Sequence, residues 1–317
     1  MNLFLDSGDT LVGELKRSTG FKGKKINLVC VAMSGWKQPQ QLLALTYLLA
    51  QGAQYDVVVN LDGFNEVALP FADNSAAGVY PLFPRSWNCY ASRARLPDKA
   101  MLQLARLARL KREERARRSF FSSPLLRRSN FCLLLFDVLD RKTRSRIAEA
   151  DRALRRIINR SPRELTPETS GPRREFYDRD GFFAAMADSW ARCSGEMDGL
   201  CRANGILYLH ALQPNQYVPG SKPLSRVEKE TAWYEGNDYA YKIAAQQGYP
   251  DLVRDGRNLR NSGEHFLDLT LLFKDVAETL YEDNCCHVNK RGNDLIAARL
   301  AAEIASLLSP AAPTSPR

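Results

Sequence analysis

Residues 55–66 read Tyr55-Asp56-Val57-Val58-Val59-Asn60-Leu61-Asp62-Gly63-Phe64-Asn65-Glu66. The first part is a nearly continuous apolar run, which is typical of a parallel strand buried on both faces. Gly63 then permits a tight turn, and polar side chains follow at the carboxyl end of the strand. Ligands of open α/β sheets bind at that end, so Asn65 is a candidate donor to a substrate oxygen. The alternative is that Asn65 only caps the segment that follows.

Other apolar runs predict the elements around this stretch. We expect strands at residues 26–33, 206–212 and 263–269, and a short helix that begins at Asp9 or Thr10. Longer helices are predicted from about residue 40 to 51, from 182 to 204, from 238 to 247 and from 294 to 308. Because a helix separates successive strands, we expect an α/β fold with a parallel sheet.

The alternation stops between about residues 70 and 200. Leucines at helical spacing predict two helices there, from Asp98 to about residue 110 and from about residue 131 to 158, and prolines mark the loops around them. We interpret this region as a helical insertion in a single α/β domain of residues 1–308. Residues 309–317 are rich in Pro, Ser and Ala and are expected to be disordered.

Charge is distributed unevenly along the chain. Residues 93–163 contain 21 Lys and Arg residues against seven Asp and Glu residues, a net charge of +14 within a total of +9. This excess predicts an anionic partner for the insertion, or else a solvated helical face with surplus arginine. No aromatic residues interleave with the basic run, so we do not expect nucleic acid to be the partner.

The composition excludes several classes of protein. With 317 residues, 44% hydrophobic and 26% charged, the chain is typical of a globular protein, and no apolar run is long enough to cross a bilayer. The seven cysteines form no CxxC pair and the three histidines are scattered, so neither a disulfide framework nor a structural zinc site is expected. The absence of a signal peptide favours the cytoplasm, although a missing N-terminus would remove that signal. No GxxxxGK[ST] phosphate loop occurs.

Three segments resemble, in order, the blocks of the SGNH/GDSL hydrolase superfamily. Val31-Ala32-Met33-Ser34-Gly35 resembles the second block, and Gly63-Phe64-Asn65-Glu66 resembles the Gly-x-Asn-Asp of the third, with Glu in place of Asp. Residues 283–292 resemble the fifth block, in which an Asp precedes a His that is followed by Asn, Gly and a closing helix. The resemblance covers roughly residues 1–68 and 205–308 and implies a three-layer, flavodoxin-like parallel sheet.

The resemblance also implies a mechanism of acyl transfer that needs no cofactor and no metal. His287 would be the base that activates a serine, and an acidic partner would hold its tautomer. The Gly35 backbone N–H and the Asn65 amide would form the oxyanion hole, so Gly35, Asn65 and His287 are expected at one edge of the sheet. The substrate would be a small-molecule, carbohydrate or lipid ester.

The chain departs from the family pattern at two points. The family spaces its acid and histidine as Asp-x-x-His, but here Asn284 occupies that position and Asp283 lies one residue earlier. Asp283 is our candidate, because an amide cannot stabilise an imidazolium as a carboxylate does. The first block is reduced to Leu3-Phe4-Leu5-Asp6-Ser7, which leaves two readings open. Either Ser7 is the nucleophile in a shortened loop, or the chain begins downstream of that block.

Two functions are therefore expected. The first is an esterase, deacetylase or acyltransferase that uses Ser7, His287 and Asp283 with an oxyanion hole at Gly35 and Asn65. The alternative is a catalytically impaired protein of the same fold, which binds an anionic partner on its basic insertion.

Overall fold

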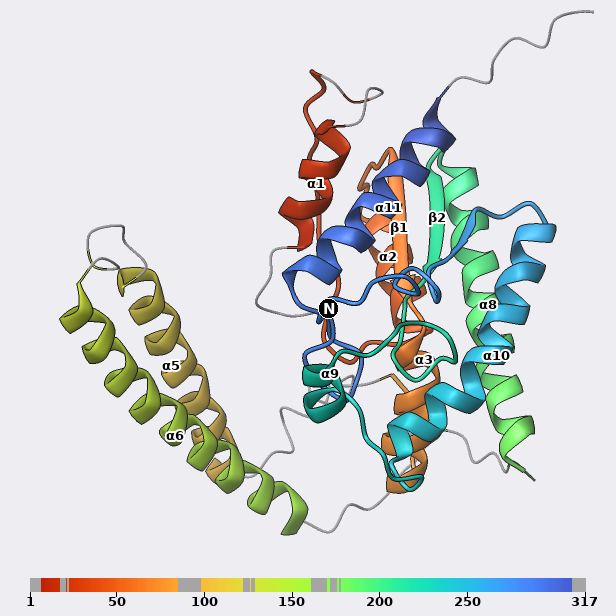
Figure 1. The fold of residues 1–317 in the computed structure, drawn as a ribbon. Helices are drawn as coiled ribbons and strands as arrows, with labels where there is room; N and C mark the ends of the chain where they lie inside the picture. Colours follow the sequence, from red (N-terminus) through yellow and green to blue (C-terminus); the bar gives the residue numbers. More distant parts are fainter. Residues whose placement is uncertain are drawn as a thin grey trace, which may run out of the picture. The chain divides into compact units, whose positions relative to one another are not determined.

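The computed structural model describes residues 7–17, 21, 23–84, 98–121, 126, 129–160, 170–171, 176 and 178–309. The chain divides into two compact units (Figure 1). One comprises Met1–Arg85 and Thr166–Arg317, and the other comprises Ser86–Leu165. Residues 310–317, for which we expect disorder, lie outside the described residues.

The main unit is built on a three-stranded parallel sheet. Its strands, in the order β1-β2-β3, are β1 (Val57–Asp62), β2 (Leu207–Leu212) and β3 (Phe266–Asp268). Asp62 pairs with Leu212, and Leu212 pairs with Asp268, so the three carboxyl ends lie at one edge. The α/β class and the parallel sheet predicted from the sequence are confirmed.

The prediction of a strand at residues 26–33 is wrong. The segment contains no strand, and Leu28, Val29 and Met33 are 43%, 65% and 50% exposed. A strand requires the backbone hydrogen bonds of a neighbour, and no described residue pairs with this segment in a ladder. An apolar run alone does not separate a paired strand from an extended chain.

Helices cover both faces of the sheet (Figure 1). Leu209 and Ala211 of β2 pack on one face with Leu15 and Leu300, which come from two helices that lie together. Tyr208 and Leu212 point to the opposite face, because successive strand residues alternate. The first face is covered by α1 (Ser7–Arg17) and α11 (Lys290–Leu308), and the second by α2 (Gln40–Ala50), α8 (Arg179–Ala203) and α10 (Ala240–Asn261).

Short helices and side-chain caps complete this unit. Asp178 accepts a hydrogen bond from the Gly181 N–H at the start of α8, and Asn289 accepts one from the Gly292 N–H at the start of α11. No described helix is long and apolar enough to cross a membrane. The short helices are α3 (Phe64–Ala68), the π-helix η2 (Leu69–Asn74), the 3-10 helix η3 (Ser75–Ala77) and α9 (Arg226–Thr231).

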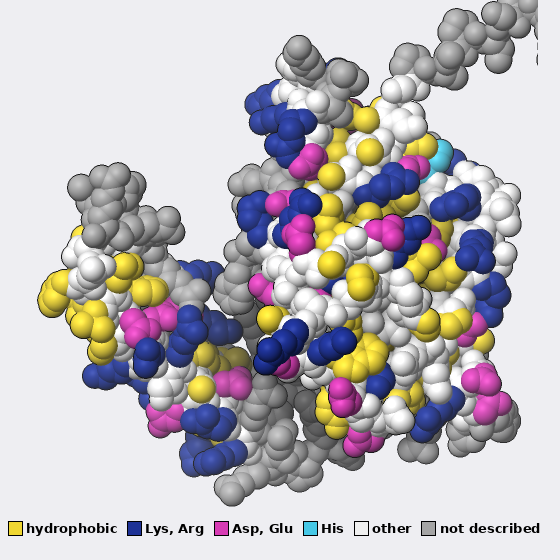
Figure 2. Space-filling model, in the orientation of Figure 1, with side chains coloured by type: hydrophobic (Ala, Val, Ile, Leu, Met, Phe, Trp, Pro, Cys, Tyr) yellow, Lys and Arg dark blue, Asp and Glu magenta, His cyan; other side chains and the backbone are white. Residues whose placement is uncertain are grey.

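The second unit is a helical hairpin. It contains α5 (Asp98–Phe121) and α6 (Asn130–Arg160), whose buried contacts include Leu107, Leu110 and Leu154. On the face of the hairpin that Figure 2 shows, Lys and Arg side chains lie among hydrophobic and acidic ones. The predicted insertion was wider, about residues 70–200, whereas α8 packs against α10 and β2 in the main unit.

Candidate functional site at the carboxyl edge of the sheet

The chain turns sharply at Gly63, directly after β1. Gly63 has a φ of 135°, and a Cβ atom there would lie 2.4 Å from Leu212 Cδ1. Any side chain at this position would meet both the unfavourable backbone conformation and the neighbouring strand. Gly63 is therefore required for the chain to leave the sheet edge and enter α3.

Glu66 holds this turn to the segment before α2. Its buried carboxylate accepts hydrogen bonds from the Gly63 N–H at 2.9 Å, the Gln38 N–H at 3.2 Å and the Gln41 amide at 3.1 Å. Burial, together with the nearby charge of Asp62, raises the pKa of Glu66 to about 8. The glutamate that replaces the aspartate of the family pattern therefore positions the loops and does not face a substrate.

Asn65 lies beside the turn that contains Gly35. Its side-chain amide donates a hydrogen bond to the Trp36 carbonyl at 2.8 Å. Gly35 has a φ of 75°, and the turn is closed by the Trp36 N–H, which donates to the Met33 carbonyl at 3.2 Å. An amide has two N–H donors, so one remains after the bond to Trp36. Asn65 and Gly35 thus come from adjacent segments, although 29 positions separate Asn65 from Trp36.

Asp283 and His287 form a hydrogen-bonded pair. Asp283 Oδ2 lies 2.5 Å from His287 Nδ1, and Asp283 Oδ1 accepts the backbone N–H groups of Cys285, Cys286 and His287 at 3.0 to 3.2 Å. The side chain of Asn284 accepts a hydrogen bond from the Tyr239 hydroxyl instead. The carboxylate of Asp283, rather than the amide of Asn284, therefore contacts the imidazole.

The pairing shifts the pKa of both groups in the direction that a charged pair requires. The hydrogen bond to Asp283 raises the pKa of His287 above its ordinary 6.5, although burial opposes this. Burial acts to raise the pKa of Asp283, but the hydrogen bond and the charge of His287 outweigh burial and lower it. The pair is therefore suited to stabilise an imidazolium.

The loop that carries this pair is attached to the carboxyl end of β2. Three residues that follow this strand donate side-chain hydrogen bonds to three successive carbonyls of the loop. Because β2 and β1 end at the same edge, the loop lies at the edge that also carries Asn65. The three bonds run from Asn215 to Cys285 at 3.2 Å, from Gln216 to Asp283 at 2.9 Å, and from Tyr217 to Asn284 at 3.0 Å.

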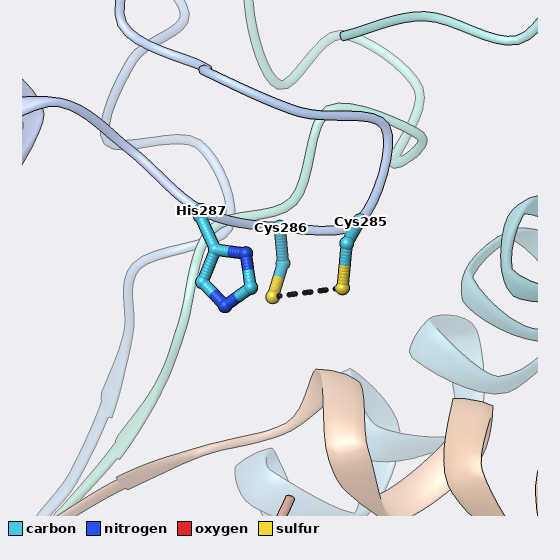
Figure 3. A group of neighbouring side chains, drawn as sticks. All are labelled: Cys285, Cys286 and His287. Carbon is cyan, nitrogen blue, oxygen red and sulfur yellow. Dashed lines mark hydrogen bonds between the residues drawn. The ribbon is translucent and has the colours of Figure 1, made fainter. Parts of the chain in front are cut away.

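Two adjacent thiols extend the polar cluster beside His287. Cys285 Sγ lies 3.6 Å from Cys286 Sγ, and both side chains point to the same side of the loop as His287 (Figure 3). The hydrogen bond from Cys285 lowers the pKa of the half-buried Cys286 to about 7, although burial opposes this. In the sequence these two cysteines stand out only because they are adjacent, and adjacency alone does not indicate a function.

Ser7 is the first residue of α1. Its side chain lies outside the part of the chain that the structure describes. The described residues thus bring Asn65, the Gly35 turn, Asp283 and His287 to one edge of the sheet, whereas the nucleophile stays a prediction.

A hydrogen-bonded Ser–His–Asp chain, separate from the Asp283–His287 pair, lies inside the main unit. Ser194 Oγ is 2.7 Å from His210 Nδ1, and His210 Nε2 is 2.9 Å from Asp62 Oδ1. Ser194 and His210 are both 0% exposed, and the Trp190 indole donates to Asp62 at 2.8 Å. A hydrolytic serine must be reached by its substrate, so this network is structural and fixes the strand end before Gly63. Sequence reasoning missed it, because its members come from three separate elements.

Comparisons with models of known protein families, with curated proteins and with solved structures found no match to this chain.

Proposed function

We propose that this protein is an SGNH/GDSL-type hydrolase of ester bonds, acting as an esterase, a deacetylase or an acyltransferase on a three-layer fold of that family. The observation that carries the proposal is the pair of Asp283 and His287 on a loop attached to the carboxyl end of β2. A carboxylate on Nδ1 leaves Nε2 of the same ring as the proton acceptor, which is the arrangement that a serine hydrolase needs. Within the described residues, no hydrogen-bond partner occupies Nε2.

The histidine and the aspartate have separate roles in this reaction. In the first step the serine Oγ attacks the ester carbonyl carbon, and its proton passes to His287 Nε2. Asp283 keeps the Nδ1–H tautomer and stabilises the resulting imidazolium. The protonated His287 then gives its proton to the departing alcohol, and water or an acceptor alcohol releases the acyl group through the same base.

The negative charge that develops on the carbonyl oxygen requires donors at fixed positions. We assign this role to the free N–H of the Asn65 amide and to the Gly35 backbone N–H. The bond from Asn65 to Trp36 and the bonds of Glu66 to both segments hold these donors before substrate arrives. Such preorganisation makes oxyanion stabilisation a large contribution to the rate.

Ser7 is the nucleophile that we propose, since the family pattern places a serine in the first block. The test measures turnover of p-nitrophenyl acetate by the native chain and by His287→Ala, Ser7→Ala and His265→Ala. His265 is the matched control, because it is an exposed histidine immediately before β3, at the opposite end of the strands.

We expect His287→Ala and Ser7→Ala each to lose at least about a hundredfold in rate, and His265→Ala to stay within twofold. If His287→Ala loses turnover but Ser7→Ala stays fast, His287 is still the base and Ser7 is excluded as the nucleophile. Equal rates for the native chain, His287→Ala and His265→Ala would exclude the hydrolase.

The basic hairpin favours a second candidate function, the binding of an anionic partner. Arg109 and Arg141 are each 79% exposed in their side chains, although each has a nearby carboxylate. Exposed arginines attract anions from a distance, and salt weakens this attraction. Replacing Arg106, Arg109, Arg112 and Arg115 together by Ser should shorten retention on heparin, most strongly at low salt. Unchanged retention at every salt concentration would exclude this surface.

A further inference from the structure

The loop at the sheet edge contains three consecutive side chains that are good ligands for soft cations. Cys285 Sγ, Cys286 Sγ and a ring nitrogen of His287 all lie within 4.8 Å of one another. Figure 3 shows the three side chains on the same side of the loop. The Tyr281–Val288 bridge closes this loop, and the hydrogen bond from the Cys286 N–H to Asp283 lies within it. Thiolates and imidazoles together favour metals of the zinc class.

The spacing of the two sulfur atoms fits a shared metal. They are 3.6 Å apart, well beyond the S–S bond of about 2.05 Å in a disulfide. Two thiolates on one tetrahedral zinc, each at about 2.3 Å, are separated by about 3.8 Å. Only a small adjustment of the loop would therefore place both sulfur atoms on one ion.

The surroundings of His287 also match those of a metal ligand. Histidines that bind metals almost always give their other ring N–H to a carboxylate or a carbonyl, which fixes the ring orientation. Here Asp283 Oδ2 lies 2.5 Å from Nδ1, and Asp283 is itself held by three backbone N–H groups. Because Asp283 occupies Nδ1, Nε2 is the ring nitrogen that is available to a metal.

We propose that Cys285, Cys286 and His287 bind one thiophilic divalent cation of the zinc class. Three protein ligands leave the fourth tetrahedral position for water or for a ligand from solution. Both thiols lose a proton on binding, so one bound ion releases two protons from the cysteines, and affinity increases with pH. The sequence did not predict this site, because consecutive ligands lack the CxxC spacing of structural zinc sites.

Binding of the ion has a consequence for the proposed hydrolase. An ion on Nε2 takes the electron pair that His287 needs to accept the serine proton. The metal site does not rest on the hydrolase, since binding can be measured without substrate. If the chain does hydrolyse esters, zinc should lower its rate at least tenfold.

The test is a titration of the reduced, metal-free full-length chain with Co²⁺ while its absorption spectrum is recorded. We expect one equivalent to bind, with the thiolate-to-cobalt charge-transfer band and the visible bands of tetrahedral cobalt, and Zn²⁺ to displace it. Cys285→Ser, Cys286→Ser and His287→Ala should each weaken binding at least about tenfold. The matched controls Cys193→Ser and Cys132→Ser replace thiols on α8 and α6 and should bind as the native chain does.

Circular dichroism shows which variants are folded, and only folded variants are compared. Native cobalt binding in the Cys285→Ser and Cys286→Ser variants, or no tetrahedral bands in the native chain, would overturn the site. A folded His287→Ala variant with unchanged bands and affinity would overturn the assignment of His287 as a ligand. None of these measurements depends on ester hydrolysis, so failure of the metal site can be distinguished from failure of the hydrolase.

Discussion

The sheet edge and the α5–α6 hairpin both carry many ionisable side chains, but these side chains have different surroundings. At the sheet edge Glu66 is buried and accepts three hydrogen bonds, and Asp283 is fixed by His287 and three backbone N–H groups. On the hairpin Arg141 is 79% exposed and pairs with Asp137 one helical turn away. Hydrogen bonds to these groups therefore fix the geometry of the first region, whereas on the hairpin the charge is available to a partner in solution.

The largest effect on stability is expected at Asp62. Its carboxylate accepts hydrogen bonds from Asn60 at 2.7 Å and Trp190 at 2.8 Å, and it lies 2.9 Å from His210 Nε2. Asp62→Ala leaves these buried partners without an acceptor and should lower the free energy of unfolding by about 3–5 kcal/mol. Urea unfolding measures this loss, and a change below about 1 kcal/mol would contradict a structural role for the network.

A smaller effect is expected at Glu228, in the first turn of α9. Its carboxylate connects this helix to the segment that precedes the loop of Asp283 and His287. The carboxylate accepts hydrogen bonds from Lys222 at 2.9 Å and from the Leu280 and Tyr281 N–H groups at 2.8 and 2.9 Å. Burial acts to raise its pKa, but these bonds hold the pKa below the ordinary 4.5. Glu228→Gln should cost about 2 kcal/mol at pH 7.

The same residue predicts how stability depends on pH. A lowered pKa means that the contribution of Glu228 is fully present above about pH 4.5 and is lost as the pH falls through the folded-state pKa. Unfolding measured between pH 7 and pH 3 should therefore decline less steeply for Glu228→Gln than for the native chain. Parallel curves for the two proteins would show that this carboxylate is not held in its charged form.

The smallest effect is expected on the hairpin. Arg141→Ala removes an exposed pair in which the arginine is 79% and Asp137 is 49% exposed. Such pairs contribute little, so the free energy of unfolding should change by less than about 0.5 kcal/mol. A loss comparable with that of Glu228→Gln would show that the hairpin uses its charges for its own stability, and the contrast between the two regions would disappear.

The sequence predicted the parts of the site that follow from local chain chemistry. The apolar run before Gly63 predicted β1, and the resemblance of residues 283–292 to a block of the SGNH/GDSL pattern led us to expect a pair of Asp283 and His287, although their spacing departs from that pattern. It failed where a feature depends on a distant neighbour. Residues 26–33 have the composition of a strand but no strand beside them, and this cannot be read from the segment itself.

The buried network and the thiol pair show two further limits. His210 read as an ordinary strand residue, because its partners on β1 and α8 are brought to it only by the fold. Cys285 and Cys286 are adjacent, but successive side chains often point to opposite sides of an extended chain, and only the loop conformation brings both thiols to the side of His287.

The most direct test of the account is the pH dependence of ester hydrolysis by the native chain and by Asp283→Asn. His287 acts as a base only when it is neutral, so the native rate should rise with pH through a midpoint above 6.5, because the bond to Asp283 raises this pKa. Asp283→Asn should be at least about a hundredfold slower, with its midpoint shifted to lower pH. An unchanged rate and an unchanged midpoint in Asp283→Asn would contradict the assignment of Asp283 as the carboxylate that orients and charges the base His287.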